Sequence, residues 1–344
     1  MAKHLIITAD DFGAHDFIDN GIKQALEKNI VNSVSVFVTY PDSEARINKL
    51  ISFRKEKNLG FEIGLHFSIT AGAPLTPSKT MTRQLNGKTI FKEVHEHDFK
   101  NVSPAELDVE LIAQHRKLKS ILENHPQLST LSIDHITHHH GVVYFFEHLF
   151  KAYVNTIKNI HPDAAIRSPM PWHKTDLSYK PLSHPGMLPI MKDGLSTGLK
   201  TFVHNLYSLQ LPDGQLRKII VAQTPKKIRD VFMKAAKEKN ICYPFCYADT
   251  IYGQRTPGYM MVLLKGIRDY PFPNLVVEFM MHLGDTTVDV AKVKDVPVGI
   301  NQKYFQGRQN ELNALLGVID WDAALANGNI RKTNFGKLRG IVMD

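Results

Sequence analysis

Leu5-Ile6-Ile7-Thr8-Ala9-Asp10-Asp11-Phe12-Gly13 is the stretch that decides the fold of this sequence. Residues 5–9 are apolar or tolerated in strands and lack the 3.6-residue spacing of a helix, so they predict a short buried strand. Asp10 and Asp11 follow at the point where this strand must end, and Gly13 permits a tight turn. Residues 16–29 then carry the apolar stripe of a helix. Because α/β folds keep their chemistry at the carboxyl ends of strands, the two carboxylates are candidate functional residues.

The two adjacent carboxylates also have a simpler interpretation. An aspartate after a strand is often only the N-cap of the next helix. However, two carboxylates this close resist joint ionisation unless a cation or a proton lies between them. Whether Asp10 and Asp11 serve chemistry therefore depends on which polar residues accompany them elsewhere in the chain.

Strands and helices alternate along the rest of the chain. This alternation predicts an α/β fold with a mostly parallel sheet, and no composition shift marks a boundary, so we expect one domain over residues 1–344. Residues 68–103 form a long loop, and 168–216 are a possible insert or lid. The further strands are expected at 33–38, 60–67, 131–136, 164–167, 218–222, 241–246 and 274–281, and the further helices at 43–57, 104–124 (with Ser103 as N-cap), 144–159 and 225–239.

Composition excludes several classes of protein. The chain has 344 residues, is 43% hydrophobic and carries a formal net charge of +8, but its lysines and arginines are dispersed, so we expect no nucleic-acid partner. No apolar run approaches the length of a membrane span, and we expect no membrane partner. Cys242 and Cys246 lack the spacing of a redox pair or a zinc site. Because residues 5–9 are too short for a signal peptide, we expect a cytoplasmic protein.

Polar residues follow several of the expected strands. Asp10 and Asp11 end the first, and histidines end three others: His66, His138 to His140, and His282. In a parallel sheet these ends converge, and a carboxylate with two imidazoles suits a divalent metal with positions open for water. Each histidine taken singly is also explained as a buried core or helix-capping residue. The joint placement at strand ends favours a site.

Five segments together resemble the motifs of one family. They occur in the expected order, and the resemblance is to the YdjC-like family of carbohydrate deacetylases, which includes chitooligosaccharide deacetylases. The resemblance implies an irregular (β/α) barrel with long inserted loops. The segments are Ala9–Gly13 with Asn20, Gly64–Phe67 with Thr70, Gly72 and Pro74, His135–His140, Ile166–Pro169, and Glu278–Gly284.

The resemblance also implies an activity and a site. The family hydrolyses N-acetyl groups on sugars with a divalent metal, here Mg²⁺ or Zn²⁺. Carried over by position, Asp11, His66 and His139 would hold the metal. Asp10 would be the general base, and His282 would protonate the leaving amine. Arg167 would orient Asp10 or bind substrate, although an arginine at this position is also explained by a structural ion pair.

Two positions depart from the family pattern. Thr137 stands where the family commonly has aspartate, and Leu283 where it has proline. A threonine hydroxyl still orients a neighbouring imidazole but supplies no charge. Alignment on His135 nominates His139 as a ligand, whereas alignment on Thr137 nominates His138.

Three hypotheses follow for function. The leading one is a metal-dependent hydrolase acting on an N-acetylated amino sugar or oligosaccharide, with a possible homodimer as its assembly. The departures at Thr137 and Leu283 motivate a second, a sugar-binding or regulatory homologue without turnover. The third is a metal-dependent phosphoesterase, because a metal-activated water also attacks phosphorus.

Overall fold

A computed structural model describes most of the chain. The described residues are 2–93, 96–125, 131–168, 232, 234, 235, 237–248, 257–269, 274–288, 302–318 and 320–342. The possible insert at 168–216 lies outside them except for Ser168, and so does the strand expected at 218–222. Of the helix expected at 225–239, the described residues 232, 234, 235 and 237–239 are helical. No described helix is long and apolar enough to cross a bilayer.

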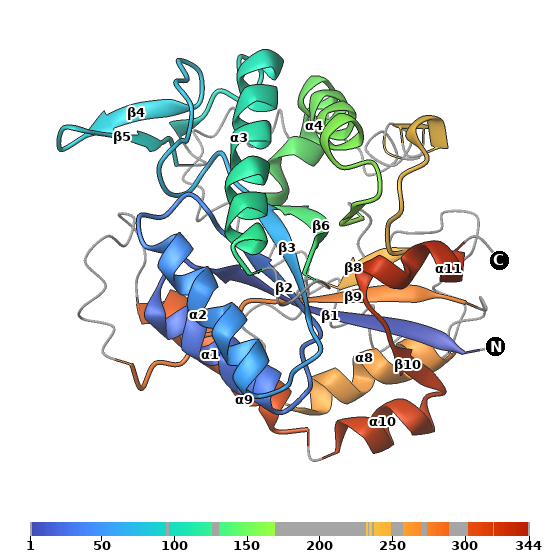
Figure 1. The fold of residues 1–344 in the computed structure, drawn as a ribbon. Coiled ribbons are helices and arrows are strands. Elements are labelled where there is room, and N and C mark those ends of the chain that lie inside the picture. Colours follow the sequence, from blue (N-terminus) through green and yellow to red (C-terminus); the bar gives the residue numbers. More distant parts are fainter. Residues whose placement is uncertain are drawn as a thin grey trace.

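A parallel sheet forms the centre of the molecule (Figure 1). Its order is β7-β6-β3-β2-β1-β9-β8, and β10 pairs with the start of β1. The first strand, β1 (Lys3–Phe12), therefore lies inside the sheet, with β2 and β9 as neighbours. The other strands are β2 (Ser33–Val36), β3 (Glu62–Phe67), β6 (Ile133–His138), β7 (Ala165–Ile166), β8 (Cys246–Ala248), β9 (Val276–Met281) and β10 (Ile330–Lys332).

The sheet curls so that its two ends approach each other. The backbone N–H of Ile166 in β7 donates to the carbonyl of Cys242, just before β8, at 3.0 Å. This bond links β7, at one end of the sheet order, to the segment that leads into β8 at the other end. This arrangement confirms the α/β fold with a parallel sheet that the sequence predicts and the barrel-like form that the resemblance implies.

Helices surround the sheet (Figure 1). Those near the start of the chain agree closely with the sequence prediction, and α3 begins as expected, with the Ser103 hydroxyl accepting from the N–H of Glu106 at 3.4 Å. The helices after residue 256 were not predicted. The set is α1 (Asp16–Glu27), α2 (Ser43–Glu56), α3 (Pro104–Glu123), α4 (Glu147–Ile160), α8 (Pro257–Asp269), α9 (Gln302–Leu316), α10 (Trp321–Asn327) and α11 (Leu338–Val342).

Three expected ranges need correction. The fourth expected strand, at 131–136, is β6 at Ile133–His138, and the strand expected at 241–246 is β8 at Cys246–Ala248. The loop expected at 68–103 contains an antiparallel hairpin, β4 (Thr82–Leu85) and β5 (Lys88–Phe91). Its Asn86-Gly87 turn has φ of +51° and +74°, which is the turn chemistry of a two-residue hairpin. The polar flanking residues hid this signal.

Acidic and amide side chains of α3 hold the loop that follows β3. The Glu110 carboxylate accepts from the N–H groups of Leu75 and Thr76 at 3.1 and 2.9 Å, and Gln114 bonds both backbone groups of Ser68. Glu106 accepts from the N–H of Thr80 at 3.0 Å. These bonds fix the loop beside the carboxyl end of β3, where His66 lies.

An apolar floor closes the amino-terminal end of the barrel. Ile6 belongs to a different hydrophobic cluster from Leu5 and Ile7, as alternation along a strand requires. Phe335, which is 2% exposed, stacks on His135 with ring centroids 4.3 Å apart. The floor consists of Ile6, Ala165, Cys242, Val276, Phe335 and Leu338.

Phe335→Ala removes the aromatic ring of this floor. We expect the free energy of unfolding to fall by about 3–5 kcal/mol, because a cavity replaces a fully packed phenylalanine. Urea denaturation followed by tryptophan fluorescence measures the change. Leu85→Ala, at an exposed hairpin position, is the control and should change stability by no more than about 0.5 kcal/mol. Equal effects of the two substitutions would contradict the role of the floor.

Candidate metal centre

A backbone irregularity separates the two adjacent carboxylates. The pairing of β1 with β2 shifts register between Ala9 and Phe12, and Asp11 has a φ of +70°. Aspartate is one of the few residues with a side chain that visits this left-handed region. The shift is a β-bulge, a device that re-aims side chains near functional sites. Asp10 and Asp11 consequently meet different partners.

Asp10 belongs to a buried ionic network. Arg167, just after β7, donates to both Asp10 carboxylate oxygens at 2.6 and 3.0 Å. The same guanidinium donates to Glu278 of β9 at 2.6–3.1 Å, and all three side chains are at least 95% buried. Burial alone would raise the pKa of Asp10, but the charge and hydrogen bonds of Arg167 outweigh it and lower the pKa to about 2. Asp10 is therefore an oriented, ionised carboxylate at neutral pH.

Asp11 lies against two imidazoles. Its Oδ1 is 3.1 Å from His66 Nε2 and 3.2 Å from His139 Nδ1, and the two ring nitrogens are 3.2 Å apart. Its Oδ2 accepts from Arg308 of α9. Burial acts to raise the pKa of Asp11, yet Arg308 and the imidazoles hold it well below its usual range. Asp11 is thus an anion whose two oxygens face different groups.

These three atoms fit a divalent metal. Two ligands about 2.1 Å from one ion are separated by roughly 3.0–3.4 Å at coordination angles of about 90–109°, and all three edges here are 3.1–3.2 Å. Asp11 Oδ1 is buried and accepts no well-aligned hydrogen bond. One carboxylate and two imidazoles is also a donor set that leaves positions open for water. Among the described residues, these three are the group of ligating side chains close enough to share an ion.

Thr137 orients His66. Its hydroxyl is 2.8 Å from His66 Nδ1 and 3.5 Å from the Leu65 carbonyl. A hydroxyl that donates to the carbonyl accepts from the Nδ1–H, which leaves the lone pair of Nε2 free for the ion that Asp11 Oδ1 and His139 Nδ1 would share. Ligating histidines usually have such a partner, often a carboxylate. The threonine therefore supplies the orientation without the charge.

The end of β6 at His138 and the turn that follows it give the three consecutive histidines different surroundings. His138 is 2% exposed, lies against Phe67 and Tyr153 on the other side of β6 from Thr137, and neither of its ring nitrogens has a hydrogen bond. His140 has a φ of +58° and its Nδ1 is 3.1 Å from the hydroxyl of Thr70. Of the three, His139 is the one whose ring reaches Asp11, so the geometry favours it over His138.

His282 directly follows β9. Its backbone N–H donates to Glu311 of α9 at 2.7 Å. Burial lowers the pKa of its imidazole to about 4, although Asp11 and Asp10 act to raise it. The ring is therefore neutral near pH 7. The next residue, Leu283, is fully buried, so the departure from proline contributes apolar packing.

Three charged residues of this region were not expected from the sequence: Glu278, Arg308 and Glu311. Glu278 had a visible signal, because it is a single charge within the apolar strand Val-Val-Glu-Phe-Met-Met. Arg308 and Glu311 had none, since α9 is rich in polar residues that look solvent-exposed. Both are nevertheless buried.

The chain matches the model of a known protein family. The family model described as YdjC-like protein matches residues 4–318, which is most of the chain. The chain belongs to the YdjC-like family. A chitooligosaccharide deacetylase of Proteus mirabilis is 31% identical to it over 152 residues, 44% of this chain and 52% of that one. A carbohydrate deacetylase of Vibrio parahaemolyticus is 31% identical over 136 residues, 40% and 48% of the two chains.

These matches cover part of each relative. The YdjC-like chain spans about half the length of the curated relatives it matches. A solved structure supports the fold over a longer range: a candidate cellobiose-phosphate cleavage protein of Enterococcus faecalis V583 superposes with a TM-score of 0.62. That comparison covers 98% of this chain and 99% of the other, at 16% identity, and so bears on the fold alone.

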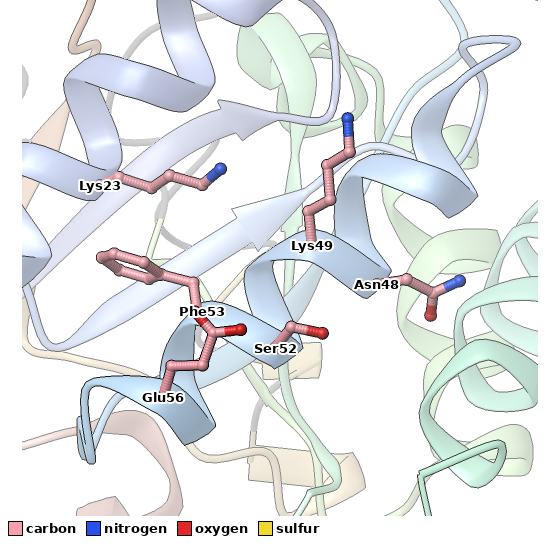
Figure 2. A pocket seen from close by; sticks show the side chains of 6 residues that line it. All are labelled: Lys23, Asn48, Lys49, Ser52, Phe53 and Glu56. Carbon is pink, nitrogen blue, oxygen red and sulfur yellow. The ribbon is translucent and has the colours of Figure 1, made fainter.

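A surface pocket elsewhere shares no residue with this centre (Figure 2). Five of its lining side chains come from α2 and one, Lys23, from α1. The Lys23 ammonium lies 5.9 Å from the centroid of the Phe53 ring. These are ordinary packing contacts between two surface helices, and nothing in the pocket connects it to Asp11.

Thr137→Val removes the group that orients His66 while keeping the side-chain shape. We expect Zn²⁺ affinity to fall by about 10–100-fold, because the imidazole loses its fixed tautomer. Competition with a chromogenic chelator measures the affinity. Thr156→Val is the matched control. Thr156 is a buried threonine of α4 that donates to Asp108 of α3 at 2.6 Å. Equal affinities in both variants would contradict the orienting role.

Proposed function

We propose that this YdjC-like protein is a metal-dependent hydrolase that removes N-acetyl groups from an amino sugar or oligosaccharide. The observation that carries the proposal is the triangle of Asp11, His66 and His139 beside a separately held carboxylate, Asp10. The deacetylase names of the matched relatives support the substrate class. A cytoplasmic location and a homodimer remain predictions.

The chain's own residues suit the steps of amide hydrolysis. When bound, a divalent ion supplies the Lewis acidity that acidifies water and polarises the amide carbonyl. Asp10 accepts the proton of the attacking water, and Arg167 holds its carboxylate ionised and in place. As the C–N bond breaks, the amine nitrogen takes a proton from His282. Because this imidazole rests neutral, the proton that Asp10 takes from water must pass to it before the C–N bond breaks.

Acetate release from N-acetylated chito-oligosaccharides tests the proposal directly. We expect release by the metal-loaded protein, loss after treatment with a chelator, and recovery when Zn²⁺ or Mg²⁺ is returned. Asp11→Ala should abolish both metal binding and release. The control is Asp322→Ala, at an 86% exposed side chain, which should leave both intact. Release that survives both chelation and Asp11→Ala would contradict the proposal, and saccharide binding without release would favour a non-catalytic homologue.

Asp10→Asn separates proton transfer from metal binding. We expect kcat to fall by about 10²–10⁴-fold, because an amide cannot accept the proton of water. The metal content should stay near that of the wild type, since Asp10 faces Arg167 rather than the imidazoles. Steady-state acetate release and elemental analysis of the same preparation provide the two measurements. An unchanged kcat would contradict the role of Asp10 as general base. A panel of phosphate esters, assayed with the same samples, tests the phosphoesterase alternative.

A further inference from the structure

The carboxylate of Asp11 is divided between two environments. Oδ1 faces His66 and His139, whereas Oδ2 accepts from the guanidinium of Arg308. Arg308 and Asp11 are 2% and 1% exposed. An ion pair this deeply buried is costly to break, because a separated charge would remain desolvated. Oδ2 is therefore held away from the imidazoles.

Close backbone packing brings α9 near enough for this contact. A Cβ at Gly284 would lie 2.9 Å from the Cβ of Arg308, and a Cβ at Gly21 of α1 would lie 2.7 Å from the Cα of Gly284. Neither glycine thus has room for a side chain. The Arg308 guanidinium also lies over the Tyr304 ring, 4.5 Å from its centroid. Arg308 is therefore packed at its Cβ against Gly284 and held at its guanidinium by Tyr304 and Asp11.

We propose that Arg308 is a positioning residue that restricts Asp11 to one-oxygen coordination of the metal. The inference rests on the proposed function, because it presumes an ion at Asp11, His66 and His139. A carboxylate that turned both oxygens to the ion would add a ligand and raise the coordination number of the ion, which would crowd the position that substrate needs. By holding Oδ2, Arg308 keeps that position open. A purely structural role would instead provide a counter-charge for Asp11 without influencing how it coordinates.

Visible absorption of the Co²⁺-loaded protein distinguishes these roles. The absorption of high-spin Co²⁺ weakens as its coordination number rises, so it reports whether Asp11 donates one oxygen or two. We expect Arg308→Met to reduce the absorption per bound Co²⁺ by at least about twofold, because the released Oδ2 joins the ion. Arg308→Lys, which retains a charged donor for Oδ2, should resemble the wild type. Arg54→Met, at a half-buried arginine over the Phe61 ring, is the control and should leave the spectrum unchanged.

The outcomes separate this inference from the proposed function. If wild-type protein binds Co²⁺ and Arg308→Met gives the wild-type spectrum at saturation, the positioning role is overturned and the metal centre stands. If wild-type protein binds no Co²⁺, or Asp11→Ala binds it equally, the metal centre fails and this role fails with it. Should Arg308→Met not fold, Arg308→Gln replaces it with the same expected decrease, since a neutral amide holds Oδ2 less firmly.

Discussion

Two neighbouring buried carboxylates at the end of β1 impose the constraint on which this structure depends. Each has its own guanidinium: Arg167 for Asp10 and Arg308 for Asp11. The arginines come from the end of β7 and from α9, so the charges of residues 10 and 11 are balanced from far along the chain. The left-handed backbone at Asp11 makes this possible, because it turns the two side chains toward different partners.

The two ion pairs differ in what they leave for chemistry. Arg167 is shared between Asp10 and Glu278, so three charged groups are locked together in a nearly solvent-free network. Such a network gives Asp10 a fixed direction, which favours catalysis by removing the cost of arranging the group during the reaction. Arg308 engages one oxygen of Asp11 and leaves the other facing two imidazoles. Arg167 thus immobilises the whole carboxylate of Asp10, whereas Arg308 holds one oxygen of Asp11 and leaves the other available to a metal.

Much of this centre was visible in the sequence. Asp10, Asp11, His66 and His282 all stand at or near the ends of apolar runs, and parallel strands bring such ends together. The choice among His138, His139 and His140 needed the end of β6, which the local pattern placed two residues too early because Thr137 and His138 are polar. The burial of Arg308 could not be predicted from the local sequence. Its burial arises from the contact of α9 with Gly284, and nothing in the helix sequence marks one arginine as inward-facing.

The central position of β1 has a consequence for how the polypeptide is made. Its neighbour β9 starts at Val276, and β10 comes still later, at Ile330. A ribosome adds about 5–20 residues per second, so the edge of β1 that pairs with β9 stays unpaired for roughly 15–50 s during synthesis. During that interval the nascent chain exposes an apolar strand with unpaired amides, a surface that invites chaperones or aggregation. The arrangement that buries the two carboxylates so well therefore delays completion of the barrel until late in translation.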